Sequence, residues 1–539
     1  MEAFEHALFL LLITTVLSVL ARWLPWPAPI TQVLGGALVA LLPRFPVITL
    51  DPGFFFLCFL PPLLFADGWL MPLREFTKAR RAILMLAIGL VTFTTLTVGL
   101  TAHWLVPGLP LSLAFALGAV VSPTDAVAVG AITSRLKVPR RLTTVLNGES
   151  LMNDATGLVA FKFAIAALVA GTFSVREVAA SFVVVAVGGF AVGLAVGYLV
   201  GRLRDLLRRL HASDPFIEIT VSLMTPFAAY LIAEPLGVSG ILSVVAAGLY
   251  SGWRDPIRMD AEVRQTAWAV WSMVLFWLNG LAFLLLGIQF PRLLDAVSHE
   301  YSPAELAVFT AGVAGVAVVG RILWMFPGAY FPFWLSRRVR ETEVRPRWQA
   351  VAVAGWAGMR GTVTLAAAMS LPLTLPDGTP FPHRDIVIFL AFGVIAVTLL
   401  LQGTTLEWVI RRLGLREDDS RAQEERLART TAVDAGLLCL RAEESGATDT
   451  EEAAALGEVI AEYERRLVEL TTEGETQASA GRRRAAGRRH RLAAVQAERQ
   501  AINDLWRRNV ISDEVHRPLQ QLLDYEESML VARPSAGGH

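Results

Sequence analysis

The sequence is poor in cysteine and has no excess of charge of either sign. Its 539 residues include two cysteines, Cys58 and Cys439, which excludes a disulfide framework and a cysteine-based zinc site. Basic and acidic residues number 48 each, so the net charge of zero gives no general attraction to nucleic acid. A Gly-x4-Gly-Lys-Ser/Thr phosphate loop is absent, which argues against an ATP-driven machine. We expect no cofactor and no nucleic-acid partner.

Apolar residues, in contrast, are abundant: they make up 54% of the chain, and the mean hydropathy is +0.51. These values predict an all-α polytopic membrane protein. The chain starts with Glu2, Glu5 and His6 in place of a basic segment, so we interpret its beginning as a membrane helix and not as a cleaved signal peptide. We expect thirteen spans, at about residues 4–21, 29–42, 52–71, 82–105, 111–133, 143–170, 177–200, 215–233, 238–252, 267–288, 304–326, 349–371 and 385–410.

The charged residues divide the chain into two regions. Residues 411–539 hold 44 of the 96 charged side chains, so we expect a transmembrane domain at 1–410 and a helical domain at 411–539. The loops after odd-numbered spans contain 21 lysines and arginines, and the loops between the other spans contain 4. The positive-inside rule then places the N-terminus outside and the C-terminal domain in the cytoplasm.

One apolar segment, at about 145–171, contains ionisable side chains. Each such group at membrane depth costs about 2.5–3.5 kcal/mol, so functional reasons are expected for Glu149 and Asp154. Ser150 and Asp154 are four residues apart and share one helix face, as do Glu149 and Asn153. This segment is therefore the first candidate for a functional site.

Two other spans are predicted to be interrupted. Pro123, within Ser122-Pro123-Thr124-Asp125, has no amide hydrogen, and the carbonyls that it frees at membrane depth must face protein, water or an ion. The span at 349–371 contains Gly355-Trp356-Ala357-Gly358-Met359-Arg360-Gly361, whose glycines weaken a helix. These spans run in opposite directions, which is typical of inverted-topology repeats with a midplane site between two broken helices. Carboxylates beside broken backbone suit a hard cation or a proton.

Four motifs carry a resemblance to a known family: Pro61-Pro62-Leu63-Leu64-Phe65, Ser122-Pro123-Thr124-Asp125, Gly148-Glu149-Ser150 through Asn153-Asp154, and Gly358-Met359-Arg360-Gly361. In this order, and over about 50–410, the sequence resembles bacterial sodium/proton exchangers of the monovalent cation/proton antiporter superfamily, in the branch related to animal sodium/proton exchangers. The resemblance implies a homodimer in the bacterial inner membrane that exchanges a monovalent cation for protons, and no enzyme activity.

The resemblance also implies roles for single residues. Asp154 would be the carboxylate that carries the ion and the proton. The transported Na+ would be bound by Asp154, Asp125, Ser150 and Thr124. Asp125, beside a helix break, is alternatively a structural helix cap.

Three further residues would support the site in the resembling family. Glu149 would form a structural ion pair with Arg360. Asn153 stands where electrogenic relatives have a second aspartate, and it implies electroneutral exchange. We leave Lys162, in the same span, without a role.

The third span departs from the family pattern. The family places an acid directly after the position of Phe65, where this chain has Ala66, and its acid is Asp67. A shift by one residue turns a helical side chain by ~100°. Asp67 is thus either a member of the ion site or an interfacial carboxylate that snorkels to the membrane surface.

Two other functional classes use similar features. An intramembrane aspartyl protease also needs two aspartates, as a dyad that shares a proton, but the Gly-x-Gly-Asp element is absent. A cation channel or a sensor with a regulatory tail would show cation flux without proton counterflow. Carboxylate and carbonyl ligands serve Na+, K+ and Li+ alike, so the choice among these cations stays open, with Na+ favoured.

Overall fold

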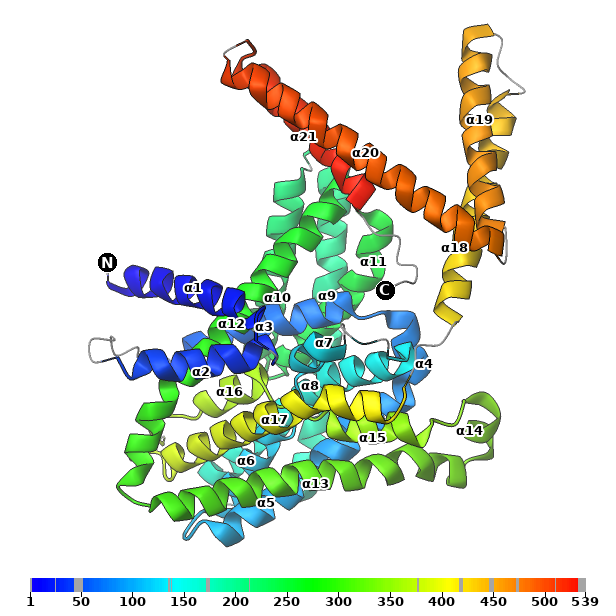
Figure 1. Ribbon diagram of the computed structural model, residues 1–539. Coiled ribbons are helices and arrows are strands. Elements are labelled where there is room, and N and C mark those ends of the chain that lie inside the picture. Colours follow the sequence, from blue (N-terminus) through cyan, green and yellow to red (C-terminus); the bar gives the residue numbers. More distant parts are fainter. Residues whose placement is uncertain are drawn as a thin grey trace. The chain divides into compact units, whose positions relative to one another are not determined.

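The computed structural model describes residues 2–24, 26–42, 52–133, 136, 138–170, 175–212, 214–375, 378–415, 420–444, 450–471, 475–508 and 510–531. Regular structure in these residues is helical, apart from one isolated bridge between Thr374 and Pro380. The chain divides into two compact units, Met1–Glu417 and Asp418–His539. Figure 1 shows the helices of both units.

The first unit contains α1 (Glu2–Ala21), α2 (Ala28–Ala40), α3 (Pro52–Leu70), α4 (Leu73–Leu84), the π-helix η1 (Met85–Leu90), α5 (Val91–Leu105), α6 (Leu111–Val121), α7 (Ala126–Thr133), α8 (Arg140–Ala170), α9 (Val175–Arg209), α10 (Pro215–Ala233), the 3-10 helix η2 (Glu234–Leu236), α11 (Gly240–Arg258), α12 (Ala261–Ser298), α13 (Pro303–Leu335), α14 (Arg337–Thr342), α15 (Trp348–Trp356), α16 (Thr362–Met369) and α17 (Arg384–Arg412). The second unit contains α18 (Ser420–Glu444), α19 (Thr450–Thr471), α20 (Glu475–Arg507) and α21 (Asp513–Val531).

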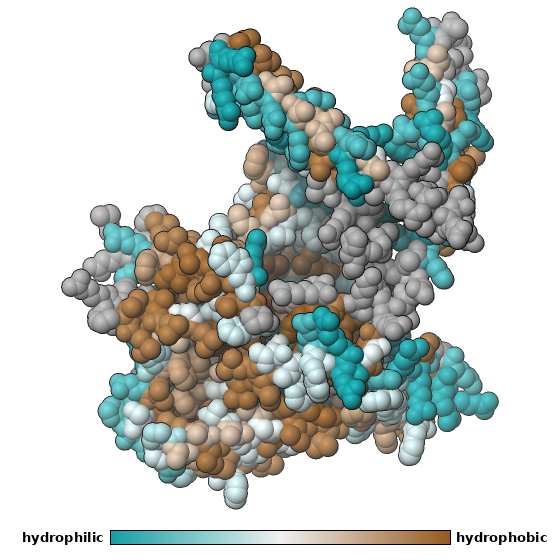
Figure 2. Space-filling model, viewed as in Figure 1, coloured by the Kyte–Doolittle hydropathy of each residue, from teal (hydrophilic) through white to brown (hydrophobic). Residues whose placement is uncertain are grey.

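The first unit has the composition of a membrane protein. Among the described residues, 9 helical segments are long and apolar enough to cross a bilayer, and α2 and residues Glu5–Ala21 of α1 are shorter apolar helices. Large apolar side chains face outward, such as Trp104 and Trp334, which are 83% and 81% exposed. Figure 2 shows hydrophobic residues over much of the visible face of this unit. Because such a surface suits lipid and not water, the predicted all-α, multi-pass membrane class is confirmed.

The two predicted interruptions are present, and they contact each other. One separates α6 from α7 at residues 122–125, and the other separates α15 from α16 at residues 357–361. The backbone N–H of Asp125 donates to the carbonyl of Met359 at 2.7 Å. The Arg360 guanidinium donates through Nε to the carbonyl of Val121 at 2.9 Å. Each break thus satisfies polar backbone groups that the other leaves unpaired, as membrane depth requires.

Helix α3 is held closely against α11. A side-chain carbon at Gly248 would lie 2.5 Å from the Phe65 carbonyl, and one at Gly252 would lie 2.3 Å from the Trp69 carbonyl. Small residues four positions apart allow two membrane helices to approach at backbone distance. This contact fixes α3 on both sides of Asp67.

The second unit consists of paired helices. Arg426 of α18 donates to the carbonyls of Leu470 and Thr471 at the end of α19, at 2.9 and 3.0 Å. In the other pair, Arg499 of α20 forms ion pairs with Asp524 and Glu527 of α21. The described part of this unit is helical, in agreement with the composition of the tail.

Candidate functional site

A small cavity lies where the two helix breaks face α3, α8 and α12. Its lining residues are Leu63, Asp67, Pro123, Thr124, Asp125, Ala126, Val127, Ser150, Asp154, Asn279, Gly361, Thr362, Val363 and Thr364. The volume of the cavity that the centre of a water molecule can occupy is about 20 Å³. One bound water needs ~10–15 Å³ on the same definition. The cavity therefore has the size for a small ion and is too small for a peptide.

Asp125 is held by both interrupted helices. Its Oδ1 accepts the backbone N–H groups of Val127 at 2.7 Å and Ala128 at 3.3 Å, which caps the N-terminus of α7. Its Oδ2 is buried at the start of α16, where the backbone N–H of Thr362 interacts with the carboxylate. A side-chain carbon at Gly361 would lie 1.6 Å from this Oδ2. The cap that we considered as an alternative therefore uses one oxygen of Asp125 and leaves the other against α16.

Ser150 and Asn153 of α8 fix the backbone of the first break. The Ser150 hydroxyl donates to the Thr124 carbonyl at 2.7 Å and accepts the N–H of Ala126 at 3.2 Å. The Asn153 Nδ2 donates to the Thr124 hydroxyl at 3.0 Å. The structure thus brings together Thr124, Asp125 and Ser150, three of the residues that the resemblance assigned to the ion site.

Asp67 and Asp154 line the same cavity as Asp125. Asp154 is 3% exposed. Among the residues that the structure describes, neither Asp67 nor Asp154 has a hydrogen bond or an ion pair. Asp67 therefore lines the cavity in spite of its shifted position in the sequence, which favours membership of the ion site over an interfacial position. Three carboxylates that line one small cavity repel each other and attract cations or protons.

The partner that we predicted for Glu149 is wrong. Glu149 pairs with Arg321 of α13, and both side chains are 0% exposed. The contact is bidentate: Arg321 Nη1 donates to Oε1, and Nη2 donates to Oε2 at 3.0 Å. Arg321 also donates to the Ala354 carbonyl of α15 at 3.0 Å. The pair thus joins α8, α13 and α15 behind the cavity.

Arg360 serves the broken backbone and not a carboxylate. Besides the Val121 carbonyl, it donates through Nη1 to the carbonyl of Gly358, and its backbone N–H donates to the Thr398 hydroxyl at 3.2 Å. Arg360 thus contacts one freed carbonyl from each break, whereas Arg321 is the arginine that contacts Glu149. Arg321 and Arg360 both stand in apolar segments of the sequence, but spacing along the chain does not say which of their helices packs against α8.

The chain matches the family model described as "Sodium/hydrogen exchanger, transmembrane" over residues 8–412. It belongs to the sodium/hydrogen exchanger family. The resemblance carried by the four motifs is thereby confirmed, and cation/proton exchange is the function that this family supports.

Named relatives agree with this assignment. The chain is 42% identical to the sodium, potassium, lithium and rubidium/H(+) antiporter of Bacillus pumilus, over 75% of this chain and 61% of that one, so it matches less than two thirds of that relative's length. It is 36% identical to the antiporter of the same name from Bacillus subtilis, over 99% of this chain and 79% of that one. The sodium proton antiporter MjNhaP1 of Methanocaldococcus jannaschii has the same fold, with a TM-score of 0.58, 19% identity, and coverage of 75% of this chain and 99% of that one.

Lys162, to which the sequence assigned no role, forms an ion pair. Its Nζ lies 2.7 Å from Oε1 of Glu234 in η2. The same oxygen accepts the backbone N–H of Gly240 at 3.3 Å. Both charged side chains are about a third or more exposed, so the pair lies outside the buried cavity.

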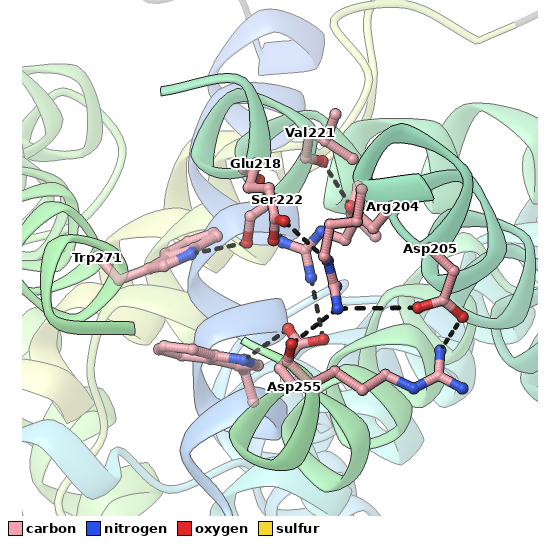
Figure 3. Close-up of polar contacts among 11 residues, drawn as sticks. Arg204, Asp205, Glu218, Val221, Ser222, Asp255 and Trp271 are labelled. Atoms are coloured by element: carbon pink, nitrogen blue, oxygen red, sulfur yellow. Dashed lines mark hydrogen bonds and ion pairs between the residues drawn. The ribbon is translucent and has the colours of Figure 1, made fainter. Parts of the chain in front are cut away.

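A second group of buried charges was missed by the sequence analysis. Arg204 donates to Asp255 at 2.9 Å and to the Glu218 carbonyl at 3.1 Å, as Figure 3 shows. Asp255 also accepts Nε1–H of Trp69, two residues beyond Asp67, at 3.2 Å. Arg208 pairs with Glu218 at 3.0 Å. The sequence indicated loop arginines at positions 204 and 208, and the acids that pair with them lie 10 to 51 residues away.

Asn279 is a further residue to which the sequence analysis gave no role. It lines the cavity from α12, and its Oδ1 is buried without a hydrogen-bond partner among the described residues. The available signal was a single amide side chain between Ala267 and Ile288, in an otherwise strongly apolar segment.

Proposed function

We propose that this chain is a secondary antiporter, not an enzyme, and that it exchanges monovalent cations for protons at the cavity between its two helix breaks. One observation carries the proposal. Asp67, Asp125 and Asp154 line one cavity of ion size, Asp125 and Asp154 are buried and Asp67 is half-buried, and among the described residues none has a basic partner. Buried carboxylates need a compensating charge, and a proton or a cation supplies it.

In this proposal Asp154 binds either a proton or the cation. Asp125, and Asp67 across the cavity, add negative charge that attracts both. The Thr124 carbonyl accepts one hydrogen bond from Ser150 and retains a second lone pair for the ion. Ser150 adds its hydroxyl oxygen, and Asn153 supports the site by holding Thr124. Proton and cation then compete for one carboxylate, which couples their movements.

The proposed cation range follows the relatives. Proteins 42% and 36% identical to this chain are named for sodium, potassium, lithium and rubidium. We therefore propose Na+ as a substrate, together with K+ and Li+. Asn153 in place of a second acid supports exchange of one cation for one proton, without net charge movement.

Finer features of the fold are also proposals. We infer thirteen spans, with 1–6 and 8–13 as inverted repeats whose broken helices α6/α7 and α15/α16 cross at the midplane. Two observations support this: the two breaks contact each other, and basic residues alternate between loops in a ratio of 21 to 4. We place the chain in the bacterial inner membrane as a homodimer, with residues 411–539 as a cytoplasmic helical domain.

Purified protein in liposomes tests the function. With a pH dye inside and no cation gradient at the start, addition of external Na+, K+ or Li+ should raise the internal pH, because protons leave as the cation enters. An imposed membrane potential should not change the initial rate in Na+ if exchange is electroneutral. Absence of any pH change with every monovalent cation would refute the antiporter proposal.

The topology needs a separate measurement. A reporter fused after Arg411 should show cytoplasmic activity, and a periplasmic signal would contradict the proposed orientation. Light scattering of the detergent-solubilised protein should give the mass of two copies of the 58.7 kDa chain, and the mass of one copy would contradict the dimer.

A further inference from the structure

Asn279 differs from every other polar residue of the cavity. The acids and hydroxyls come from α3, α8, the first break and α16, whereas Asn279 comes from the middle of α12, Ala261–Ser298. It carries no charge and belongs to none of the four motifs. An uncharged amide at membrane depth, opposite a group of carboxylates, therefore needs its own explanation.

The usual role of a membrane asparagine does not account for it. Such residues hydrogen bond to a neighbouring helix, yet within the described residues Oδ1 of Asn279 is buried without a partner. The neighbouring Gly280 makes the helix contact at this level, because a side-chain carbon there would lie 2.4 Å from Cγ2 of Thr14 in α1. Asn279 is turned from Gly280 by ~100° and lines the cavity instead. Its oxygen is a buried acceptor whose hydrogen-bonding capacity is unused within the described residues.

We propose that Asn279 supplies an uncharged oxygen ligand to the transported cation and thereby sets the preference among monovalent cations. This inference rests on the proposed antiport function. The carboxylates attract any cation and also protons, so they discriminate little by charge. Selectivity among ions of equal charge depends on the number, field strength and spacing of the ligand oxygens. A proton needs one carboxylate oxygen, so Asn279 affects cation binding and not proton binding.

The test compares two substitutions that remove a buried amide. Asn279→Leu removes the amide from the cavity. Gln402→Leu is its matched control: Gln402 in α17 is 0% exposed, both of its amide atoms lack a partner in the described part of the chain, and it is not among the lining residues. Apparent affinities for Na+, K+ and Li+ are measured in liposomes from pH 6 to 9 for each variant.

Asn279→Leu should weaken apparent cation affinity by about 10-fold, the loss expected for one contact with a charged group. The factors should differ among the three cations, so that their ranking or ratios change. The pH at which protons begin to compete should stay the same, and Gln402→Leu should match the wild type in all these properties.

A second variant keeps the inference testable if Asn279→Leu fails to fold. Asn279→Asp retains size and oxygens and adds a charge, so it should bind cations more tightly at pH 9 and show a steeper loss of affinity towards pH 6. The inference would be overturned if folded Asn279→Leu had the same ratios of apparent affinity for Na+, K+ and Li+ as the wild type. If Asn279→Leu does not fold, unchanged affinity ratios in Asn279→Asp would overturn it. Either result counts against the inference even when the wild type exchanges normally. Absence of exchange by the wild type would instead refute the proposed function.

Discussion

Buried carboxylates occur in two kinds of surroundings within the first unit. Asp154 lies in the cavity and, among the described residues, has neither a hydrogen bond nor an ion pair. Glu149 is buried as completely, but it is held by Arg321, and Asp255 is held by Arg204. The difference separates two uses of a charge. A carboxylate with a permanent partner joins helices, whereas one without a partner needs a counter-charge that enters and leaves.

The cost of burial explains why this distinction matters. Moving an ion from water into a protein interior costs several kcal/mol even after relaxation. A bidentate arginine offsets this cost permanently and fixes the geometry of the pair. A carboxylate in a cavity that admits a water-sized ion can exchange its compensating charge during transport. The following predictions test this comparison, beginning with the largest effect.

Asp154→Asn should abolish exchange while the protein is inserted and folded normally. The amide keeps the shape of the side chain but neither binds nor releases a proton at working pH. Exchange is measured in liposomes from pH 6 to 9, with thermal stability as the check on folding. Near-normal coupled exchange by the folded variant would remove Asp154 from the mechanism. Asp125→Asn should be severely impaired in exchange, and its amide oxygen can still accept the N–H groups of Val127 and Ala128 that cap α7, so its stability should change little.

Competition at Asp154 also predicts a direction of pH dependence for the wild type. Protonation neutralises the carboxylate, so the apparent affinity for Na+ should fall as the pH is lowered. The measurement is the Na+ concentration for half-maximal exchange at several pH values. Independence of this concentration from pH would mean that cation and proton do not share a site.

Glu149→Gln should lower stability by about 3–5 kcal/mol, because it leaves Arg321 charged and buried without its carboxylate. The thermal midpoint in detergent and the folded yield measure this effect. Removing both charges, in Glu149→Gln with Arg321→Met, should recover part of the loss. Glu149→Gln with Arg360→Ala should show no such recovery, since Arg360 bonds to carbonyls. Recovery with Arg360→Ala instead would restore the pairing predicted from the sequence.

Trp69→Phe should have a smaller effect. It removes the N–H that Asp255 accepts at 3.2 Å but leaves Arg204 in place, and a hydrogen bond to a charged group contributes about 1.5–3 kcal/mol. The control is Trp268→Phe: Trp268 packs on the Trp69 ring at 5.4 Å and is 52% exposed. It should change stability by less than about 0.5 kcal/mol. Equal effects of the two substitutions would mean that ring packing, and not the hydrogen bond, matters.

The sequence predicted features that depend on local rules. Pro123 and the glycines around Arg360 marked the two breaks, because backbone chemistry acts within a few residues. Helical periodicity placed Ser150 and Asp154 on one face. The partner of Glu149 and the position of Asp67 depend on which helices pack together. For Asp67, the cause is the close approach of α3 and α11, and no local rule predicts it.

Asn279 and Arg204 show a second limit of the sequence. A single amide in an apolar span has no periodic companion, so only the fold connects it with the acids. Arg204 counted as a basic residue of a loop, and that count supports the predicted orientation. In the structure it is 3% exposed and bonded to Asp255. A residue can therefore contribute to topology and still be part of a buried ion pair.

Lys162→Met should have the smallest effect and gives the comparison its third case. Its pair with Glu234 is as short as a buried one, at 2.7 Å, but the two side chains are 44% and 32% exposed. Water and salt screen such pairs, which contribute about 0–1 kcal/mol. The thermal midpoint should therefore change little, and less at high salt than at low salt. Exchange by Lys162→Met should remain close to that of the wild type across pH 6 to 9. A loss of stability equal to that of Glu149→Gln would show that a short distance alone determines the contribution of an ion pair in this bundle, and that burial does not.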